Sequence, residues 1–271
     1  MPLPEPAPDR TAIVTGASSG IGTELARELA RRGLGVTLVA RREDRLRDLA
    51  DELAKAHEIR AEVIAADLTD EASRARIVTE LATRGLTADV LVNNAGLSTT
   101  GPVAQSAPQK ELAMIRTDVE AVVHLCSLFL PGMVERGRGA VLNVASTAAF
   151  QPLPGQAGYG GSKAFVLSYT QAARAELKGS GVTMTVLCPG PVETEFADVA
   201  GFTDEQTSNA LPKFMWLSAQ EVAKTAIDGL AKGKGVVIPG AGNRVGAYVA
   251  HVTPRRVLLP LLARQHPALK A

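Results

Sequence analysis

The sequence predicts an α/β fold: a single doubly wound parallel sheet of about seven strands, Rossmann-like, with helices on both faces. From Thr11 to about Ile238, short β-branched runs alternate with longer segments of helical periodicity. A glycine-rich turn directly follows the first of these runs. The 271 residues contain no internal repeat or linker, so one domain is favoured over two.

Seven short apolar runs are predicted as strands, at residues 12–15, 36–39, 62–65, 90–92, 140–144, 183–187 and 236–238. Between the first two, Leu25 and Leu29 share one face of a predicted helix that begins at Gly20 and ends before Gly33. The longest helical patterns cover residues 110–135 and 156–178. Each of these longer segments is expected to cross from one strand to the next over a face of the sheet.

The composition excludes several classes of protein. Lys and Arg number 29 against 28 Asp and Glu, which argues against a protein that binds nucleic acid by charge. Two cysteines without CxxC spacing form no disulfide framework, so we expect a reducing, cytoplasmic location. The four histidines show no metal-ligand spacing, and no metal site is expected.

The turn after the first strand has the glycine spacing of a dinucleotide-binding loop. Gly16 lets the chain turn sharply, Gly20 lets the backbone approach a pyrophosphate, and Gly22 lets the following helix pack close to the sheet. A plain tight turn is the alternative. The strand before the turn and the amphipathic helix after it favour the dinucleotide.

The residues after the second strand predict which dinucleotide binds. An acid at this place would bind the ribose 2′-hydroxyl of NAD, but the sequence has Arg41 and Arg42, which suit a 2′-phosphate. We therefore expect NADP(H), with Arg41 as first contact and Arg42 as support. The alternative is that both arginines lie on a solvated helix start beside Glu43 and Asp44.

A catalytic set is predicted in the second half of the chain. Tyr159 and Lys163 are four residues apart, so they share one helix face, and the ammonium is expected to lower the pKa of the phenol. Ser146, at the end of the fifth strand, is placed to hold a carbonyl oxygen while Tyr159 donates a proton. An ordinary helix residue and a helix cap are the alternatives for Tyr159 and Ser146.

Together with Asn93-Asn94-Ala95-Gly96, these motifs resemble the short-chain dehydrogenase/reductase family of the NADP-preferring type, over roughly residues 10–240. The resemblance implies adenine contacts from Asp67 and Leu68, and Asn93 as a brace of the central strand. Plain turn chemistry is the alternative for each. The full set of implied cofactor contacts is Gly16, Ser18, Ser19, Gly20, Ile21, Gly22, Arg41, Arg42, Asp67, Leu68, Asn93, Ala95, Gly96, Lys163, Pro189, Gly190, Val192 and Thr194.

One position departs from the family pattern. Where the family has an Asn that helps to hold a water chain to the lysine, this sequence has Asp118. A carboxylate accepts hydrogen bonds only. Asp118 is therefore expected either to hold the water or to draw Lys163 into an ion pair, which places the proton relay in question but not the fold.

The chain is expected to have three parts, of which the resemblance covers the middle one. Residues 1–9 hold four prolines and are expected to be a disordered tail without a targeting signal. Residues 10–240 are expected to form the dinucleotide-binding and catalytic domain, with a lid at about 195–217, and residues 241–271 an extension that packs on the domain or on a partner. The apolar stretch 245–263 is interrupted by prolines and charges, so no transmembrane helix is predicted.

The expected function is NADPH-dependent transfer of hydride between the nicotinamide and a ketone, an aldehyde or a secondary alcohol. Phe196, Phe202, Phe214 and Trp216 lie in or beside the predicted lid, which favours an apolar substrate, although these side chains could instead complete the core. Reduction of a 3-oxoacyl thioester is one alternative. A catalytically silent NADP(H)-binding sensor or scaffold is the other.

The family resemblance also implies a homodimer or homotetramer formed by the two long helices. The apolar residues available for that contact, unless they are buried internally, are Ala121, Val122, Leu125, Phe165, Val166 and Tyr169. Beyond Gly240 lie further apolar residues beside Arg255 and Arg256, namely Tyr248, Val249, Val257, Leu258, Leu259, Leu261 and Leu262. This extension could cover the pocket, pack on a partner subunit or rest on a lipid surface.

Overall fold

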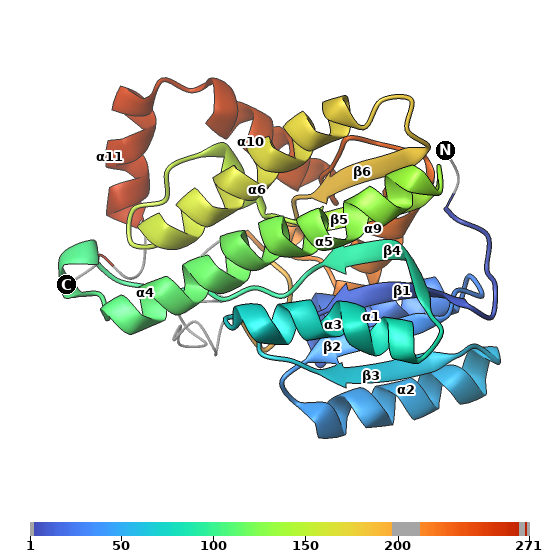
Figure 1. Cartoon of the computed structure of the whole chain (residues 1–271). Helices are drawn as coiled ribbons and strands as arrows, with labels where there is room; N and C mark the ends of the chain where they lie inside the picture. Colours follow the sequence, from blue (N-terminus) through green and yellow to red (C-terminus); the bar gives the residue numbers. More distant parts are fainter. Residues whose placement is uncertain (1–2, 197–211, 266–268, 270–271) are drawn as a thin grey trace.

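The computed structural model describes residues 3–196, 212–265 and 269 and has one seven-stranded parallel sheet (Figure 1). The strand order is β3-β2-β1-β4-β5-β6-β7, which confirms the predicted doubly wound sheet. The strands are β1 (Arg10–Thr15), β2 (Val36–Ala40), β3 (Ala61–Ala65), β4 (Thr87–Asn93), β5 (Gly139–Val144), β6 (Val182–Leu187) and β7 (Val236–Val237). Every predicted strand is present, with ends shifted by at most three residues.

Helices cover both faces of the sheet. The helices are α1 (Gly20–Ala30), α2 (Glu43–His57), α3 (Glu71–Thr83), α4 (Pro108–Ile115), α5 (Ala121–Glu135), α6 (Ala157–Glu176), α9 (Ala219–Ala231), α10 (Ala241–Val252) and α11 (Arg255–Gln265). Buried side chains of α1, α2 and α9 join one apolar cluster, and those of α3, α5 and α6 join a second. Neighbouring residues of β1, Ile13 and Val14, belong to different clusters, because successive strand side chains point to opposite faces.

The strand order reverses between β1 and β4. After β1 the chain builds outward through β2 and β3, then returns to place β4 on the other side of β1. In open α/β sheets such a switch point opens a crevice at the carboxyl ends of the strands. The loops that follow β1 and β4 are therefore the first place to look for a ligand site.

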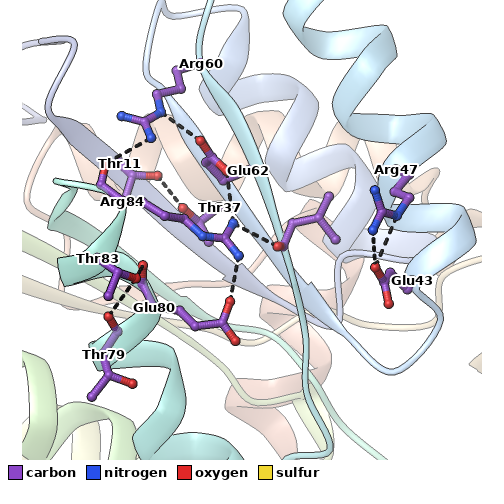
Figure 2. A network of polar contacts seen from close by, with 11 residues as sticks. Thr11, Thr37, Glu43, Arg47, Arg60, Glu62, Thr79, Glu80, Thr83 and Arg84 are labelled. Carbon is purple, nitrogen blue, oxygen red and sulfur yellow. Dashed lines mark hydrogen bonds and ion pairs between the residues drawn. The ribbon is translucent and has the colours of Figure 1, made fainter.

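Charged side chains protect the exposed edge of the sheet at β3 (Figure 2). Arg84 donates to the Glu62 carboxylate at 2.9 Å, to the Val63 carbonyl and to Glu80, while Arg60 donates to Glu62 at 2.8 Å. An edge strand that carries paired charges is a poor template for pairing with another chain. This network has a structural role and lies outside the crevice.

The long helix predicted at residues 110–135 is present as one continuous helical stretch, Pro108–Glu135, with a wide turn in its middle. Between α4 and α5 the chain makes a π-helical turn, Arg116–Glu120, which contains the buried Asp118. The stretch Pro108–Glu135 is long and apolar enough to cross a membrane by length and composition. This is weak evidence for a span, because Leu125, Cys126 and Phe129 are buried in the apolar core.

Two expectations about the surface are corrected. Leu3 packs against an apolar cluster and Pro4 is buried, in contrast to the disordered tail that the prolines suggested. Four of the six residues proposed for subunit contact, Ala121, Val122, Leu125 and Val166, are buried inside the chain. They pack against the sheet, so only Phe165 and Tyr169 of that set remain partly exposed.

Candidate active site

The carboxyl ends of the strands border a cavity of about 620 Å³. Its walls come from the loops that follow β1 to β6, together with the start of α6 and one residue of α11. All of the predicted contact residues line it except Asn93 and Asp118. The switch point of the sheet is therefore the site that sequence motifs had indicated.

The glycine turn leaves room for a ligand at the start of α1. Gly20 has φ +56°, a left-handed conformation that favours glycine. A side chain at Gly22 would place its Cβ 2.2 Å from the Gly16 carbonyl oxygen, so only glycine allows the helix this close to the strand. The first turn of α1 contains no acidic residue, so its free N–H groups face the cavity without a competing carboxylate. This cradle fits a pyrophosphate.

The arginines after β2 lie at the same cavity. Arg41 is exposed, whereas Arg42 donates to the Ser18 hydroxyl at 3.1 Å and to the Ser18 carbonyl. Arg42 also pairs with Glu195 at 3.0 Å, and Arg45 of α2 pairs with the same carboxylate at 2.9 Å. Arg42 at the start of α2 is therefore held against the glycine turn, and its contact with a cofactor stays a prediction. The contacts of Arg42 also show an acid, Glu195, which sequence reasoning had not connected with the arginines.

Asp67, which follows β3, has one carboxylate oxygen engaged. The backbone N–H and the hydroxyl of Thr69 both donate to Oδ1, at 3.0 and 2.9 Å. Thr69 does not donate to the other oxygen, Oδ2, and Asp67 lines the cavity. The turn therefore fixes the carboxylate and leaves an acceptor for a ligand amine.

The catalytic set comes together at the end of β5 and the start of α6. Ser146 caps the short helix Thr147–Phe150 by accepting from the Ala148 N–H at 3.1 Å, so its oxygen is held while its proton stays available to another acceptor. The Lys163 ammonium lies 5.6 Å from the centre of the Tyr159 ring. Ser146 can therefore cap the short helix and also donate its proton to a substrate, because the cap uses only its oxygen as an acceptor.

Asp118 forms a buried ion pair with Lys163. The Nζ and Oδ2 atoms are 3.0 Å apart, and the side chains are 5% and 0% exposed. The Leu97 N–H donates to Oδ1 at 2.7 Å and the Ser162 hydroxyl to Oδ2 at 3.3 Å. Of the two roles expected for Asp118, the structure shows the ion pair. Asp118 lies behind Lys163 and does not line the cavity, so it is a positioning residue.

The charges of this cluster act against one another on Tyr159. Burial raises the pKa of the phenol above its ordinary value; the Lys163 ammonium and a hydrogen bond from Ser146 lower it, and Asp118 raises it further. The expected fall in the pKa of Tyr159 is therefore wrong in its net direction, although Lys163 acts as expected. For Lys163, burial lowers the pKa, but Asp118 and Tyr159 outweigh burial and the net pKa is raised.

A short segment after β6 closes one side of the cavity. Val192 forms a backbone bridge with Leu217, which fixes both ends of the predicted lid. The Phe196 ring lies 5.8 Å from the Tyr159 ring, and Trp216 also lines the cavity. Phe214 is 75% exposed and points elsewhere. Phe202 lies outside the described residues.

The C-terminal extension also reaches the site. Asn243 of α10 is buried against Gly190 and donates to the carbonyls of Met215 and Pro239, at 3.0 and 3.1 Å. Leu262 of α11 lines the cavity. The extension therefore packs on the domain and covers part of the pocket, which was one of the three roles left open.

The sequence predicted a cofactor contact for Asn93, which does not line the cavity, and it did not predict Asn94 and Thr117, which do. Asn93 is buried and donates to Asn143 of β5 at 2.8 Å, which suits a brace but not a cofactor contact. The next residue, Asn94, lines the cavity and donates to the Thr15 carbonyl at 2.9 Å. Thr117 also lines the cavity, because the π-helical turn directs it there. No periodic pattern in the sequence distinguishes these positions.

The chain is similar to known oxidoreductases. It is 37% identical to sulfoacetaldehyde reductase 2 of Chromohalobacter salexigens over 215 residues, 78% of this chain and 84% of that protein. It is 35% identical to a very-long-chain 3-oxoacyl-CoA reductase of Bos taurus over 192 residues, 69% of this chain and 61% of that protein. A short-chain dehydrogenase from Sphingobium yanoikuyae, solved in complex with NADPH, superposes with a TM-score of 0.79 at 31% identity, over 93% of this chain and 95% of that one.

The family profile described as short chain dehydrogenase matches residues 10–204. That range includes the glycine turn, the loop after β4 and the Ser146, Tyr159 and Lys163 set. Family, fold and site geometry agree on an oxidoreductase that uses a nicotinamide cofactor and a small-molecule substrate. The chain belongs to the short-chain dehydrogenase family.

Proposed function

We propose that the protein is an NADPH-dependent reductase of apolar ketones or aldehydes, or the dehydrogenase of the corresponding alcohols. One observation carries the proposal: Ser146, Tyr159 and Lys163 line the same cavity as Arg41 and Arg42. The arginines follow β2 and the catalytic residues follow β5, with β1 and β4 between them in the sheet. This separation suits an elongated dinucleotide that lies across the switch point.

The residues of this chain have distinct tasks. When bound, the nicotinamide supplies hydride to a carbonyl carbon or takes it from an alcohol. The Ser146 hydroxyl, held by Ala148, donates to the carbonyl oxygen, and the Tyr159 phenol donates a proton as that oxygen gains negative charge. The Lys163 ammonium stabilises the phenolate that remains on Tyr159. Asp118 keeps Lys163 charged and in place.

The choice of NADPH rests on charge at the adenosine end. Arg41 and Arg42 line the cavity there, and a 2′-phosphate is a better partner for guanidinium than a hydroxyl is. The protein from Sphingobium yanoikuyae was solved with NADPH. The comparison to make is kcat/KM with NADPH and with NADH. An equal or better value with NADH would contradict the proposal.

The choice of an apolar substrate rests on the walls beside Tyr159. Leu153, Phe196, Trp216 and Leu262 line the cavity. Within the described part of the chain, the cationic residues that line it are the two arginines and Lys163, so no further cation offers a clamp for an anionic substrate. The two curated relatives are named for a small polar aldehyde and for a long acyl thioester, so family membership alone does not select the substrate.

The test combines a carbonyl panel with one substitution. Purified enzyme is assayed with NADPH against a long-chain or polycyclic ketone, a 3-oxoacyl thioester and a small sugar-like ketone. Tyr159→Phe should lower turnover by at least about a hundredfold while the NADPH affinity, followed by fluorescence, changes little. Tyr169→Phe, which alters a tyrosine that does not line the cavity, is the matched control.

Each outcome of this test has a meaning. Turnover that survives in Tyr159→Phe would overturn the mechanism. NADPH binding without turnover of any carbonyl would favour the silent sensor. A preference of about tenfold or more for the sugar-like ketone would overturn the apolar substrate.

We also propose that the protein forms a homodimer or homotetramer. Phe165 of α6 is 41% exposed and stacks on Tyr169 at 5.8 Å between ring centres, and Leu112 of α4 is exposed as well. These side chains offer apolar surface outside the core. Light scattering is the measurement, and a monomer at micromolar concentration would contradict assembly.

A further inference from the structure

Helix α10 has an apolar stripe on the side that faces away from the domain. Asn243, Ala247 and Ala250 are buried against the fold. On the other side, every member of a stripe with helical spacing is more than half exposed: Val245, Tyr248, Val249 and Val252. Residues at i, i+3, i+4 and i+7 form one continuous helix face. An amphipathic helix would have polar residues on this solvent side.

Helix α11 continues this surface. Leu258 is buried and Leu262 lines the cavity, whereas Val257 and Leu261 are at least half exposed, one helical turn apart. Arg255 ties the two helices to the domain, because its guanidinium donates to the carbonyls of Ala250 and Phe150, at 3.2 and 3.3 Å. Both helices lie at the same end of the molecule (Figure 1). Their exposed apolar side chains therefore belong to one end of the protein.

The charged side chains of residues 241–271 are all of one sign. No Asp or Glu follows Asp228 in the sequence, whereas residues 241–271 contain five Lys and Arg. The net charge of the whole chain is only +1, so the rest of the chain is slightly acidic. Arg244, Arg256 and Arg264 are exposed, and within the described residues none of them forms an ion pair. Exposed apolar side chains flanked by unpaired cations are typical of surfaces that bind anionic lipid.

We propose that α10 and α11 dock the protein on a membrane surface that contains anionic lipid, with the α10 stripe in the headgroup region and the arginines on the phosphates. A second copy of the chain is a poorer occupant, because two copies of this surface would bring like charges together. The proposal concerns a peripheral contact and does not need a membrane-spanning helix. It also does not depend on the proposed enzymatic activity.

Docking in this way has a consequence for the cavity. Leu262 lines the cavity from the same helix whose Val257 and Leu261 face outward. A helix that rests on lipid with one side and borders the pocket with the other brings the pocket close to the bilayer. An apolar substrate dissolved in the membrane would then have a short path to Tyr159.

The test is sedimentation of the full chain with vesicles. Phosphatidylcholine vesicles that contain about one third phosphatidylglycerol should bind the protein, pure phosphatidylcholine should not, and binding should weaken as salt is raised to about 1 M. Val249→Asp should weaken binding by about tenfold or more, because it removes an apolar anchor and adds a negative charge. Arg256→Glu should weaken it by at least about fivefold.

Matched controls separate docking from misfolding. Val134→Asp, on the exposed surface of α5, and Lys224→Glu, on α9, should bind vesicles like the wild type. NADPH fluorescence and the unfolding temperature should stay unchanged in all four variants. The assay needs no turnover, so its result is independent of whether the proposed reaction occurs.

Two results would overturn the proposal. One is a wild type that does not sediment with anionic vesicles, or that binds equally well after Val249→Asp. The other is a change of molecular mass in Val249→Asp by light scattering without any lipid binding in the wild type, which would assign the stripe to a second copy of the chain.

Discussion

Replacing Asp118 by Asn should weaken the fold, because it leaves the buried Lys163 ammonium without its partner. Removing one member of a buried ion pair costs about 3–5 kcal/mol. The Asn oxygen still accepts from the Leu97 N–H, so we expect the lower end, about 3 kcal/mol. For a chain of this size each kcal/mol shifts the melting temperature by about 2–4 °C, so a fall of roughly 6–12 °C is expected.

The same substitution should change the pH dependence of catalysis. Asp118 raises the pKa of Tyr159, so removing its charge should lower that pKa. Reduction requires the protonated phenol and is lost as the pH rises through the pKa of Tyr159. The alkaline limb of kcat/KM for reduction should therefore move to lower pH in Asp118→Asn. Below that limb, turnover should be retained, because the proton donor is unchanged.

The stability difference has its own pH dependence. The pKa of Lys163 is raised in the folded protein, so the stabilisation by its charge is complete below the unfolded value near pH 10.4 and is lost as the pH rises through the folded pKa. The difference in the free energy of unfolding between wild type and Asp118→Asn should persist at neutral pH and disappear in strong alkali.

Urea unfolding and pH–rate profiles measure these effects, and Asp48→Asn on the exposed face of α2 is the matched control. Unchanged stability together with an unchanged alkaline limb would refute the role given to the ion pair. Complete loss of turnover in a folded Asp118→Asn that still binds NADPH would show that the carboxylate is itself required.

Three further substitutions test the cofactor site. Arg41→Asp should weaken the binding of NADPH by about tenfold or more and the binding of NADH much less, because it places a carboxylate beside the 2′-phosphate. Equal losses of affinity for both cofactors in binding titrations would count against that contact. Glu195→Gln should tighten NADPH by up to about fivefold, since exposed ion pairs are worth about 0.2–1 kcal/mol and Glu195 holds arginines of this site; a weaker NADPH affinity would contradict the competition. Gly22→Ala should lower stability by about 1–3 kcal/mol and abolish cofactor binding, because its Cβ would lie 2.2 Å from the Gly16 carbonyl oxygen. Gly161→Ala, which meets no atom within 4 Å, should be tolerated, and equal behaviour of the two variants in thermal unfolding would refute the steric argument.

Local signals in the sequence account for most of the fold. The strand at residues 36–39 could be predicted because it is a short run of residues that is buried on both faces of the sheet. Such a run is recognised from its own residues, without knowledge of the strands beside it. The wide turn between α4 and α5 could not be predicted from the sequence; its Asp118 contacts Leu97 and Lys163, which are both distant in the sequence. Contacts between residues that are far apart in the sequence produce no periodic pattern in it.

The candidate active site also has some features that could be predicted from local sequence and others that depend on tertiary contacts. Tyr159 and Lys163 could be paired from their spacing alone, since four residues bring side chains to one helix face. The net direction of the Tyr159 pKa could not be derived, because burial of the phenol depends on how the surrounding loops pack. Asn93 and Asn94 are chemically identical neighbours at a strand end, and only the structure shows that one faces Asn143 and the other the cavity.

The π-helical turn at Arg116–Glu120 limits how this helix can change in evolution. Such a turn holds one residue more than an α-helical turn, and each residue rotates a helix by about 100°. Deleting a single residue here would restore a regular helix, and the faces of α4 and α5 would keep their relative orientation, because the wide turn already absorbs the extra residue. The contact of α4 with α6 would remain, whereas the local bulge that places Asp118 beneath Lys163 would be lost. The chain could therefore shorten by one residue at this point without changing the packing of the helix, but the buried ion pair would be lost.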